Sequence, residues 1–178
     1  MWMTIAQIPG LIAMGLNIFS FQQRNQKTLI RIQLYSSILF IVHFAMLGAV
    51  TGCVLNVISM ARAYVFSNKQ NAWARHKAWI PVFVVIYLIV YALTFTLFGK
   101  EPTWQNLLLE LLPVIGMIAM TVGFSLENAA QVRTLSLINS PAWLIYNILN
   151  GSIGGALSEA FSLASVIIGM MRLDRRTK

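Results

Sequence analysis

Apolar segments of about 20 residues follow one another along most of this chain, with short polar breaks between them. An α-helix rises about 1.5 Å per residue, so such a segment crosses the hydrocarbon layer of a bilayer, which is about 30 Å thick. Composition agrees, since 58% of the 178 residues are hydrophobic and only 10% are charged. A soluble domain of this size keeps more charge on its surface. The sequence therefore predicts an all-α integral membrane protein.

The apolar pattern divides into seven membrane-spanning helices. They cover residues 3–21, 29–47, 48–66, 79–98, 106–126, 135–150 and 151–173. The second and third segments adjoin, as do the sixth and seventh, and glycines at each junction permit the chain to reverse. These glycines are Gly48 and Gly52 at the first junction, and Gly151, Gly154 and Gly155 at the second. We therefore expect a helical hairpin at both places.

Basic residues predict the orientation, because Lys and Arg are in excess in short cytoplasmic loops. With seven crossings and an external N terminus, Lys100 alone falls outside and the C terminus is cytoplasmic. The cytoplasmic set is Arg24, Lys27, Arg31, Arg62, Lys69, Arg75, Lys77, Arg133, Arg172, Arg175, Arg176 and Lys178. The net charge of +8 then reflects topology and not nucleic-acid binding, because these charges are divided among several loops. The first segment lacks the features of a cleaved signal peptide.

The chain contains an internal repeat, in which residues 32–61 align with residues 135–164 at a constant shift of 103. The aligned pairs are Phe40 and Trp143, His43 and Tyr146, Gly48 and Gly151, Gly52 and Gly155, Asn56 and Glu159, and Ser59 and Ser162. One residue of slippage places Pro9 on Pro113. A single helix separates the copies, so both enter the membrane from the same side and the repeats are parallel. We expect one membrane domain over residues 1–178, with repeat 1 at 3–66, a linker helix at 79–98 and repeat 2 at 106–173.

A run in the sixth segment carries a family resemblance. It reads Ser140-Pro141-Ala142-Trp143-Leu144-Ile145-Tyr146-Asn147 and is followed by Gly151-Ser152-Ile153-Gly154-Gly155. The chain resembles the bacterial inner-membrane YgjV family over most of its length, and more remotely the SWEET and PQ-loop (MtN3-like) transporter superfamily. The resemblance implies two parallel three-helix bundles joined by a linker helix, which is the SWEET-like 3+1+3 arrangement. It also implies the bacterial inner membrane, where the external N terminus is periplasmic.

Two polar residues, Asn56 and Glu159, lie near the middle of the third and seventh segments. A carboxylate is costly at the bilayer centre, so Glu159 serves either function or a protonated structural hydrogen bond. In SWEET-like proteins the substrate-binding asparagines lie on these two helices; Asn56 matches that pattern and Glu159 departs from it. The departure favours proton coupling or a cationic substrate over a neutral sugar. Glycines beside these residues either pack helices or leave room for a ligand; they are Gly48, Gly52, Gly151 and Gly155.

A polar and aromatic stripe runs along the sixth segment at helical spacing. It consists of Trp143, Tyr146, Asn147 and Asn150. The stripe either lines a substrate pocket or forms an interfacial aromatic belt, which suits Tyr146 better than the deeper Trp143. In SWEET-like proteins an aromatic residue on this helix and its mate on the second helix flank the substrate, so the resemblance selects Trp143 and Phe40. Tyr146 and Asn147 complete the candidate substrate-binding set.

Prolines inside the predicted helices mark candidate hinges, because proline removes a backbone donor and bends a helix. They are Pro9, Pro113 and Pro141. SWEET-like folds have four such prolines, and here the fourth position is Ile38. Three further polar residues have two interpretations each. His43 is either a satisfied polar residue or a proton-handling group, and Arg62 and Glu110 are either snorkelling anchors or gating partners.

The sequence favours a small-solute transporter that works by alternating access about a midplane site. The alternative is a membrane protein that does not transport and binds a lipid or protein partner on the same fold. We expect no enzyme, because no catalytic or nucleotide-binding motif is present. We also expect no cofactor, no metal site and no nucleic-acid partner. The expected partners are membrane lipid and a small-molecule substrate, and the pattern does not predict an oligomeric state.

Overall fold

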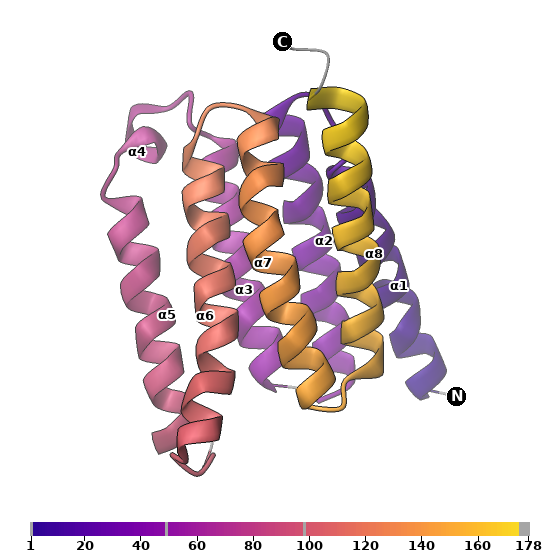
Figure 1. Cartoon of the computed structure of the whole chain (residues 1–178), viewed down its shortest axis with the longest axis vertical. Helices are drawn as coiled ribbons and strands as arrows, with labels where there is room; N and C mark the ends of the chain where they lie inside the picture. Colours follow the sequence, from indigo (N-terminus) through magenta and orange to yellow (C-terminus); the bar gives the residue numbers. More distant parts are fainter. Residues whose placement is uncertain (1, 49, 98, 175–178) are drawn as a thin grey trace.

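The computed structural model of the chain describes residues 2–48, 50–97 and 99–174. All secondary structure in these ranges is helical. The elements are α1 (Trp2–Ser20), α2 (Gln26–Met46), α3 (Val50–Ser67), α4 (Ala72–Arg75), α5 (Trp79–Thr96), α6 (Trp104–Ser125), α7 (Ala129–Leu149), α8 (Ile153–Gly169) and η1 (Met170–Asp174). All of these except α4 and η1 are long helices that run side by side, and the start of α1 and the end of η1 lie at opposite ends of the bundle (Figure 1).

Four of the described helices are long and apolar enough to cross a membrane. They are Gln26–Met46, Trp79–Thr96, Trp104–Ser125 and Ile153–Asp174, the last formed by α8 together with η1. Shorter apolar segments cover Ala6–Ser20 in α1 and Gly52–Ser67 in α3. Helix α7 has 21 residues, but side chains such as Arg133, Asn139 and Asn147 lower its hydropathy. A helix of that composition needs cover from neighbouring helices.

Helices α2 and α7 begin three or more residues earlier than the apolar pattern predicts, because asparagine caps set their starts. The Asn25 side chain accepts a hydrogen bond from the Thr28 backbone N–H, so α2 starts at residue 26 and not at 29. Asn128 caps the backbone N–H of Gln131 in a capping box, so α7 starts at residue 129 and not at 135. The short helix α4 was not predicted, since its four residues have no apolar periodicity.

The shift of 103 that relates the sequence repeats also relates local geometry. It places the start and the end of α2 on those of α7. It places Gly48, with φ of 68°, on Gly151, with φ of 70°. Both glycines turn the chain in the left-handed region, as the predicted hairpins require. A Cβ on either would meet no atom within 4 Å, so these two serve the turns and not helix packing.

Gly52 and Gly155, in contrast, lie inside helices and pack closely. A Cβ at Gly52 would lie 2.8 Å from the Phe44 ring, and one at Gly155 would lie 2.4 Å from Oδ1 of Asn147. Phe44 and Asn147 are themselves related by the shift of 103. The two helical hairpins, α2 with α3 and α7 with α8, therefore close through the same glycine position.

The long helices pack in a pattern that repeats between the two ends of the sequence. Helix α2 packs against α1 and α3, and α7 packs against α6 and α8. We call α1–α3 the first half and α6–α8 the second half. The halves meet where α3 contacts α6, where α1 contacts α8 and, less extensively, where α2 contacts α7. Helix α5 packs mainly on α6, at the outside of the bundle (Figure 1).

The two ends of the bundle differ in charge and in packing. The basic end is formed by the α1–α2, α3–α5 and α6–α7 connections and by η1, and the Lys100 end is formed by the other three turns. Within the described ranges, every Lys and Arg except Lys100 lies at or within two turns of the basic end. The apolar core also gathers toward that end, on both sides of the α3–α6 contact. Its buried members are Leu29, Ile30, Ala63, Val65, Phe66, Ala74, Phe83, Tyr87, Val114, Met117, Met120, Phe124, Ala129 and Val132.

Gly169 is the glycine on which the α1–α8 contact depends most directly. A Cβ there would lie 2.6 Å from the Phe21 backbone carbonyl oxygen, and backbone cannot move aside as a side chain can. We expect Gly169→Ala to destabilise the protein by about 1–3 kcal/mol through overpacking. The matched control is Gly15→Ala in α1, where nothing lies within 4 Å. That change should be neutral or stabilising by up to about 1 kcal/mol. Thermal unfolding in detergent measures both, and equal melting temperatures would contradict the close approach.

Candidate functional site

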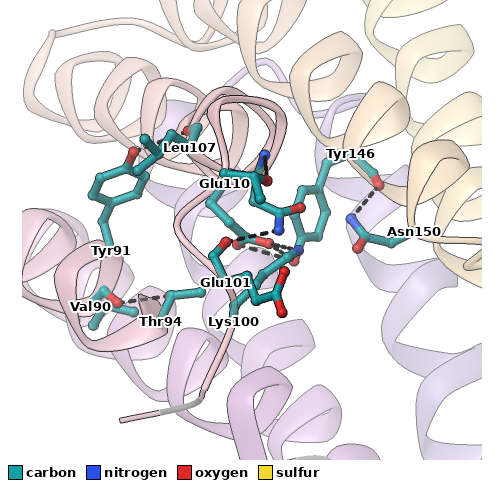
Figure 2. Close-up of polar contacts among 11 residues, drawn as sticks. Val90, Tyr91, Thr94, Lys100, Glu101, Leu107, Glu110, Tyr146 and Asn150 are labelled. Carbon is teal, nitrogen blue, oxygen red and sulfur yellow. Dashed lines mark hydrogen bonds and ion pairs between the residues drawn. The ribbon is translucent and has the colours of Figure 1, made fainter. Parts of the chain in front are cut away.

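An ionised cluster lies at the Lys100 end of the bundle, between the α5–α6 loop and helices α6 and α7. Lys100 forms an ion pair with Glu110. The Tyr146 hydroxyl lies 3.4 Å from each carboxylate oxygen of Glu110, as Figure 2 shows. The Glu110 side chain is only 10% exposed. Glu110 is therefore held inside the bundle and does not extend outward as a snorkelling anchor would.

The local sequence around α6 holds this cluster in place. The Thr103 hydroxyl caps the backbone N–H of Asn106, which starts α6 directly after the Lys100 loop. The Asn106 side chain donates to the Glu101 carbonyl at 2.9 Å and ties the loop to the helix. On the other side of α6, the Tyr91 hydroxyl donates to the Leu107 carbonyl at 3.0 Å and fixes α5 (Figure 2).

A narrow cavity extends from this cluster toward the middle of the bundle. Its lining comes from α3, α5, α6 and α7 and consists of Leu55, Tyr87, Val90, Tyr91, Thr94, Glu110, Pro113, Val114, Met117 and Tyr146. The free volume is about 30 Å³, which is close to the volume that one water molecule occupies in the liquid. In this conformation the cavity has room for water or a small ion, but a sugar or amino acid needs the helices to separate.

A buried arginine lies behind the inner end of the cavity. Arg62 of α3 is 7% exposed, and its Nη1 donates to the Tyr87 hydroxyl at 3.3 Å and to the Met117 carbonyl at 3.2 Å. Its guanidinium carbon also lies 5.1 Å from the centre of the Phe124 ring, within the range of a cation–π contact. The expectation that Arg62 snorkels to the surface is therefore wrong. Side chains on α3 lean toward its N terminus, which directs Arg62 into the bundle.

Two buried hydroxyl groups complete this network. The Tyr87 and Thr121 hydroxyls lie 2.8 Å apart, and the Thr121 hydroxyl donates to the Met117 carbonyl at 2.8 Å. Since the Tyr87 oxygen accepts from Arg62 and the Thr121 proton goes to Met117, the Tyr87 proton is directed to Thr121. The Arg62 Nε has no hydrogen-bond partner within the described chain.

The basic end of the α3–α6 contact is closed by Lys69, in the loop after α3. Its ammonium donates to the Leu126 carbonyl, to the Ser125 carbonyl at 3.3 Å and to the Gln26 side chain at 3.1 Å. Gln26 itself donates to the Leu126 carbonyl at 2.6 Å. A cation at the C-terminal end of α6 is favoured by the helix dipole. Burial lowers the pKa of Lys69, and the charge of Glu127 partly opposes that shift.

The α1–α8 contact is closed by hydrogen bonds along its length. The Asn17 amide donates to the Ser162 hydroxyl at 3.2 Å, and the Ser165 hydroxyl donates to the Ile18 carbonyl at 2.7 Å. Gln22 donates to both the hydroxyl and the carbonyl oxygen of Ser165. These bonds join the two halves through groups that hydrocarbon cannot satisfy.

Arg133 closes the same contact at the basic end. Its guanidinium donates to the Phe21 carbonyl at 3.1 Å and to the Gln23 carbonyl at 2.8 Å. It also forms an ion pair with Asp174 of η1. Arg133 is 2% exposed, so a cation buried on α7 caps the end of α1.

The two predicted midplane residues have different described partners. Asn56 on α3 donates to the Gly52 carbonyl of its own helix at 2.9 Å. Glu159 on α8 lies beside the Ser140 hydroxyl of α7, which is buried and outside hydrogen-bond geometry with any described group. Helix α3 packs against α2 and α6, whereas α8 packs against α7 and α1. A site shared by Asn56 and Glu159 stays a prediction.

The predicted aromatic residues occupy two different surroundings. Phe40 on α2 stacks on Phe44, with ring centres 6.1 Å apart. The Trp143 ring on α7 contacts the Tyr146 ring edge to face, with ring centres 5.6 Å apart. It also packs against Gly116 of α6, where a Cβ would lie 3.2 Å from the Trp143 ring. No described ring contact joins Phe40 to Trp143. Of the predicted substrate-binding residues, Tyr146 is the one that lines the cavity.

The other predicted residues contact their own helix or a neighbouring one, or lie inside long helices. The Asn147 amide donates to the Trp143 carbonyl at 2.8 Å and so stays on its own helix. His43 Nδ1 lies 2.7 Å from the Ala6 carbonyl, which accepts a hydrogen bond from that nitrogen; this supports the satisfied-polar interpretation. The proposed hinges lie inside long helices, Pro9 in α1, Pro113 in α6 and Pro141 in α7. Of these, Pro113 lines the cavity.

Sequence reasoning missed the role of Lys100 as the partner of Glu110 and the roles of Lys69 and Arg133 at the helix ends. It treated these cations only as loop charges that set orientation. One signal was available for Arg133, since it lies a full turn inside a helix once the Asn128 cap is recognised. Nothing comparable in the sequence places Lys69 against the end of α6.

Comparison with known proteins gives a family and a relative. The family model of a bacterial inner membrane protein, Imp-YgjV, matches residues 4–177. The inner membrane protein YgjV of Escherichia coli (strain K12) is 25% identical over 175 residues, which cover 98% of this chain and 87% of that protein. No solved structure matches the chain.

The ion pair of Lys100 and Glu110 can be measured by a double-mutant cycle. Because both side chains are largely shielded from solvent, we expect Lys100→Gln and Glu110→Gln to couple by about 1 kcal/mol in the free energy of unfolding. Glu101→Gln in place of Glu110→Gln is the control, since Glu101 is exposed in the same loop and should show no coupling. Additive effects of Lys100→Gln and Glu110→Gln would mean that the pair does not form.

Proposed function

The chain belongs to the Imp-YgjV family of bacterial inner membrane proteins, and we propose that it is a small-solute transporter that works by alternating access of its two halves. It is a multi-pass protein of the bacterial inner membrane. The observation that carries the proposal is the cavity between α3, α5, α6 and α7. It begins at an ionised cluster at one end of the bundle and stops at closed packing toward the other end.

In this proposal seven helices cross the membrane as two parallel three-helix bundles with α5 as the linker. Helices α1, α3 and α7 have 19, 18 and 21 residues, lengths that reach about 27–32 Å at 1.5 Å per residue. The shared shift of 103 and the similar packing within each half support parallel repeats. The basic end is cytoplasmic, in agreement with the distribution of Lys and Arg. The N terminus is then periplasmic and the C terminus cytoplasmic.

The described conformation is closed at the basic end, which is the cytoplasmic end in this proposal. Lys69 and Arg133 each join one half to backbone carbonyls of the other at the basic end, and the apolar core spans the same level. The Lys100 end has no comparable cluster of buried apolar residues among the described positions. Rocking of the halves opens the basic end when these bonds exchange for water, and it closes the cavity at the Lys100 end. Pro113 and Pro141 are the hinges nearest to the cavity.

Glu159 has a separate role in this cycle. Its carboxyl group lies beside the Ser140 hydroxyl on the neighbouring helix, away from the cavity lining. Protonation of Glu159 is coupled to the packing of α7 and α8, and Asn56 joins the solute site when the halves separate. Glu159→Gln, which approximates the protonated acid, should keep the protein folded and remove the pH dependence of uptake.

One observation favours the alternative of a membrane protein that does not transport. The cavity volume of about 30 Å³ is too small for a sugar or an amino acid. The α3–α6 and α1–α8 contacts between the halves are also closed. A protein that keeps this conformation permanently would bind lipid or a protein partner on its outer faces. Transport therefore requires that the halves move, and that motion is what the experiment has to test.

A reversible disulfide across the halves tests the proposal. Asn17 and Ser162 hydrogen-bond across the α1–α8 contact. The variant carries Asn17→Cys and Ser162→Cys, together with Cys53→Ala, which removes the native cysteine. Oxidation then forms a disulfide that joins the two halves. Proteoliposomes are screened for uptake of sugars, amino acids and small cations. We expect a solute to be taken up by the reduced protein, lost on oxidation and restored by dithiothreitol.

The controls are the two single-cysteine variants, which should transport under both redox conditions. Absence of uptake of every solute by the reduced protein favours the alternative. Uptake that persists when the disulfide is formed would contradict alternating access of the two halves.

A further inference from the structure

Arg62 carries a buried charge that no acidic side chain in the described structure compensates. The five acidic residues all lie within the described ranges, and the ion pairs formed there join Lys100 to Glu110 and Arg133 to Asp174. Arginine remains protonated in proteins, and a charge inside a membrane protein needs a partner or water. The neutral groups around Arg62 supply hydrogen bonds but no negative charge.

The position of Arg62 relates this charge to the cavity. Tyr87 and Met117 line the inner end of the cavity, and the Arg62 Nη1 donates to the hydroxyl of the first and the carbonyl of the second. The guanidinium thus lies directly behind the cavity wall. The Nε–H of Arg62 is buried and lacks a hydrogen-bond partner, so one donor of the guanidinium remains unused.

We propose that the inner end of the cavity between α3, α5, α6 and α7 binds a small monovalent anion, a halide or a small carboxylate, against Tyr87 and Arg62. The Tyr87 hydroxyl rotates from Thr121 and donates to the anion. Thr121 keeps its bond to the Met117 carbonyl, so this rotation leaves no buried hydroxyl without a partner. The Arg62 guanidinium supplies the opposite charge across one layer of protein.

Size and charge around the site restrict the ligand. A free volume of about 30 Å³ admits an ion about as large as water and excludes phosphate esters and larger organic acids. Glu110 is the acidic residue that lines the cavity, and its ion pair with Lys100 offsets its repulsion of an entering anion. It lies seven residues from Met117 along α6, or about 10 Å at 1.5 Å per residue. This site does not depend on transport, because an anion bound at equilibrium stabilises the fold whether or not the halves move.

Anion-dependent stability of the purified full-length protein tests the proposal. Sodium gluconate, whose anion is too large for the cavity, is replaced stepwise by sodium chloride or sodium formate at constant ionic strength. We expect the melting temperature of the wild type to rise by about 2–4 °C, as for a ligand at several times its dissociation constant. Chloride and formate together separate a halide site from a carboxylate site. Broadening of the ³⁵Cl resonance by the wild-type protein reports chloride binding directly.

The variants assign the effect to Arg62. Arg62→Gln should abolish both the chloride shift and the ³⁵Cl broadening, while Arg31→Gln, which removes an exposed charge on α2, should keep them. If Arg62→Gln does not fold, Tyr87→Phe retains the guanidinium and should still weaken both signals. Equal melting temperatures of the wild type in chloride, formate and gluconate would overturn the proposal. So would signals that persist in Arg62→Gln, that keep their wild-type size in Tyr87→Phe, or that are lost equally in Arg31→Gln.

Discussion

Cations that donate to backbone carbonyls, two of them buried (Arg62 and Arg133) and one half-buried (Lys69), connect the two halves of this protein, and the remaining features of the bundle depend on these contacts. Arg62 donates to the Met117 carbonyl, Lys69 to the Ser125 and Leu126 carbonyls, and Arg133 to those of Phe21 and Gln23. In each of these hydrogen bonds the donor lies in or directly after one half, and the acceptor carbonyl belongs to the other. Lys69 and Arg133 meet carbonyls at or just beyond the ends of α6 and α1, where a carbonyl has no partner within its own helix, so each cation satisfies the backbone and gains from the helix dipole. The Met117 carbonyl that Arg62 meets lies inside α6. Because all three lie toward the basic end, that end is closed while the cavity extends from the opposite end.

Divergence between the repeats explains why the cavity occurs on one side of the bundle. At the position where the first half has His43, bonded to the Ala6 carbonyl, the second half has Tyr146, bonded to Glu110. Helix α5 packs on α6 and adds Tyr87 and Tyr91 to the lining, and the first half has no corresponding linker helix. Asn56 and Glu159 differ in the same way, since one bonds to its own helix and the other lies beside a neighbour. Positions related by the shift of 103 share turns and glycine contacts, whereas their polar side chains have different partners.

Hydropathy and spacing in the sequence predicted the features that depend on local chemistry. The helical segments, the turns at Gly48 and Gly151 and the shift of 103 all follow from apolar length and from backbone conformations that favour glycine. The starts of α2 and α7 were placed late because polar first turns hid the caps at Asn25 and Asn128. The cavity could not be predicted from the sequence, because its lining comes from four helices and includes Glu110, which is held by its ion pair with Lys100. The burial of the Arg62 side chain was not predicted, because the distance of a residue from a helix end does not determine the direction of its side chain.

Alternating access, as proposed, requires the two halves to move against each other as bodies, so that one end opens when the other closes. Electron–electron distance measurements in nanodiscs test it most directly, with spin labels at exposed positions in a Cys53→Ala background. One pair is Leu47 with Asn150 at the Lys100 end, and the other is Arg24 with Gln131 at the basic end. Lys69→Met removes a cation that closes the basic end. The account predicts that this change lengthens the distance from Arg24 to Gln131 and shortens that from Leu47 to Asn150. Unchanged, single narrow distributions for both pairs would contradict it.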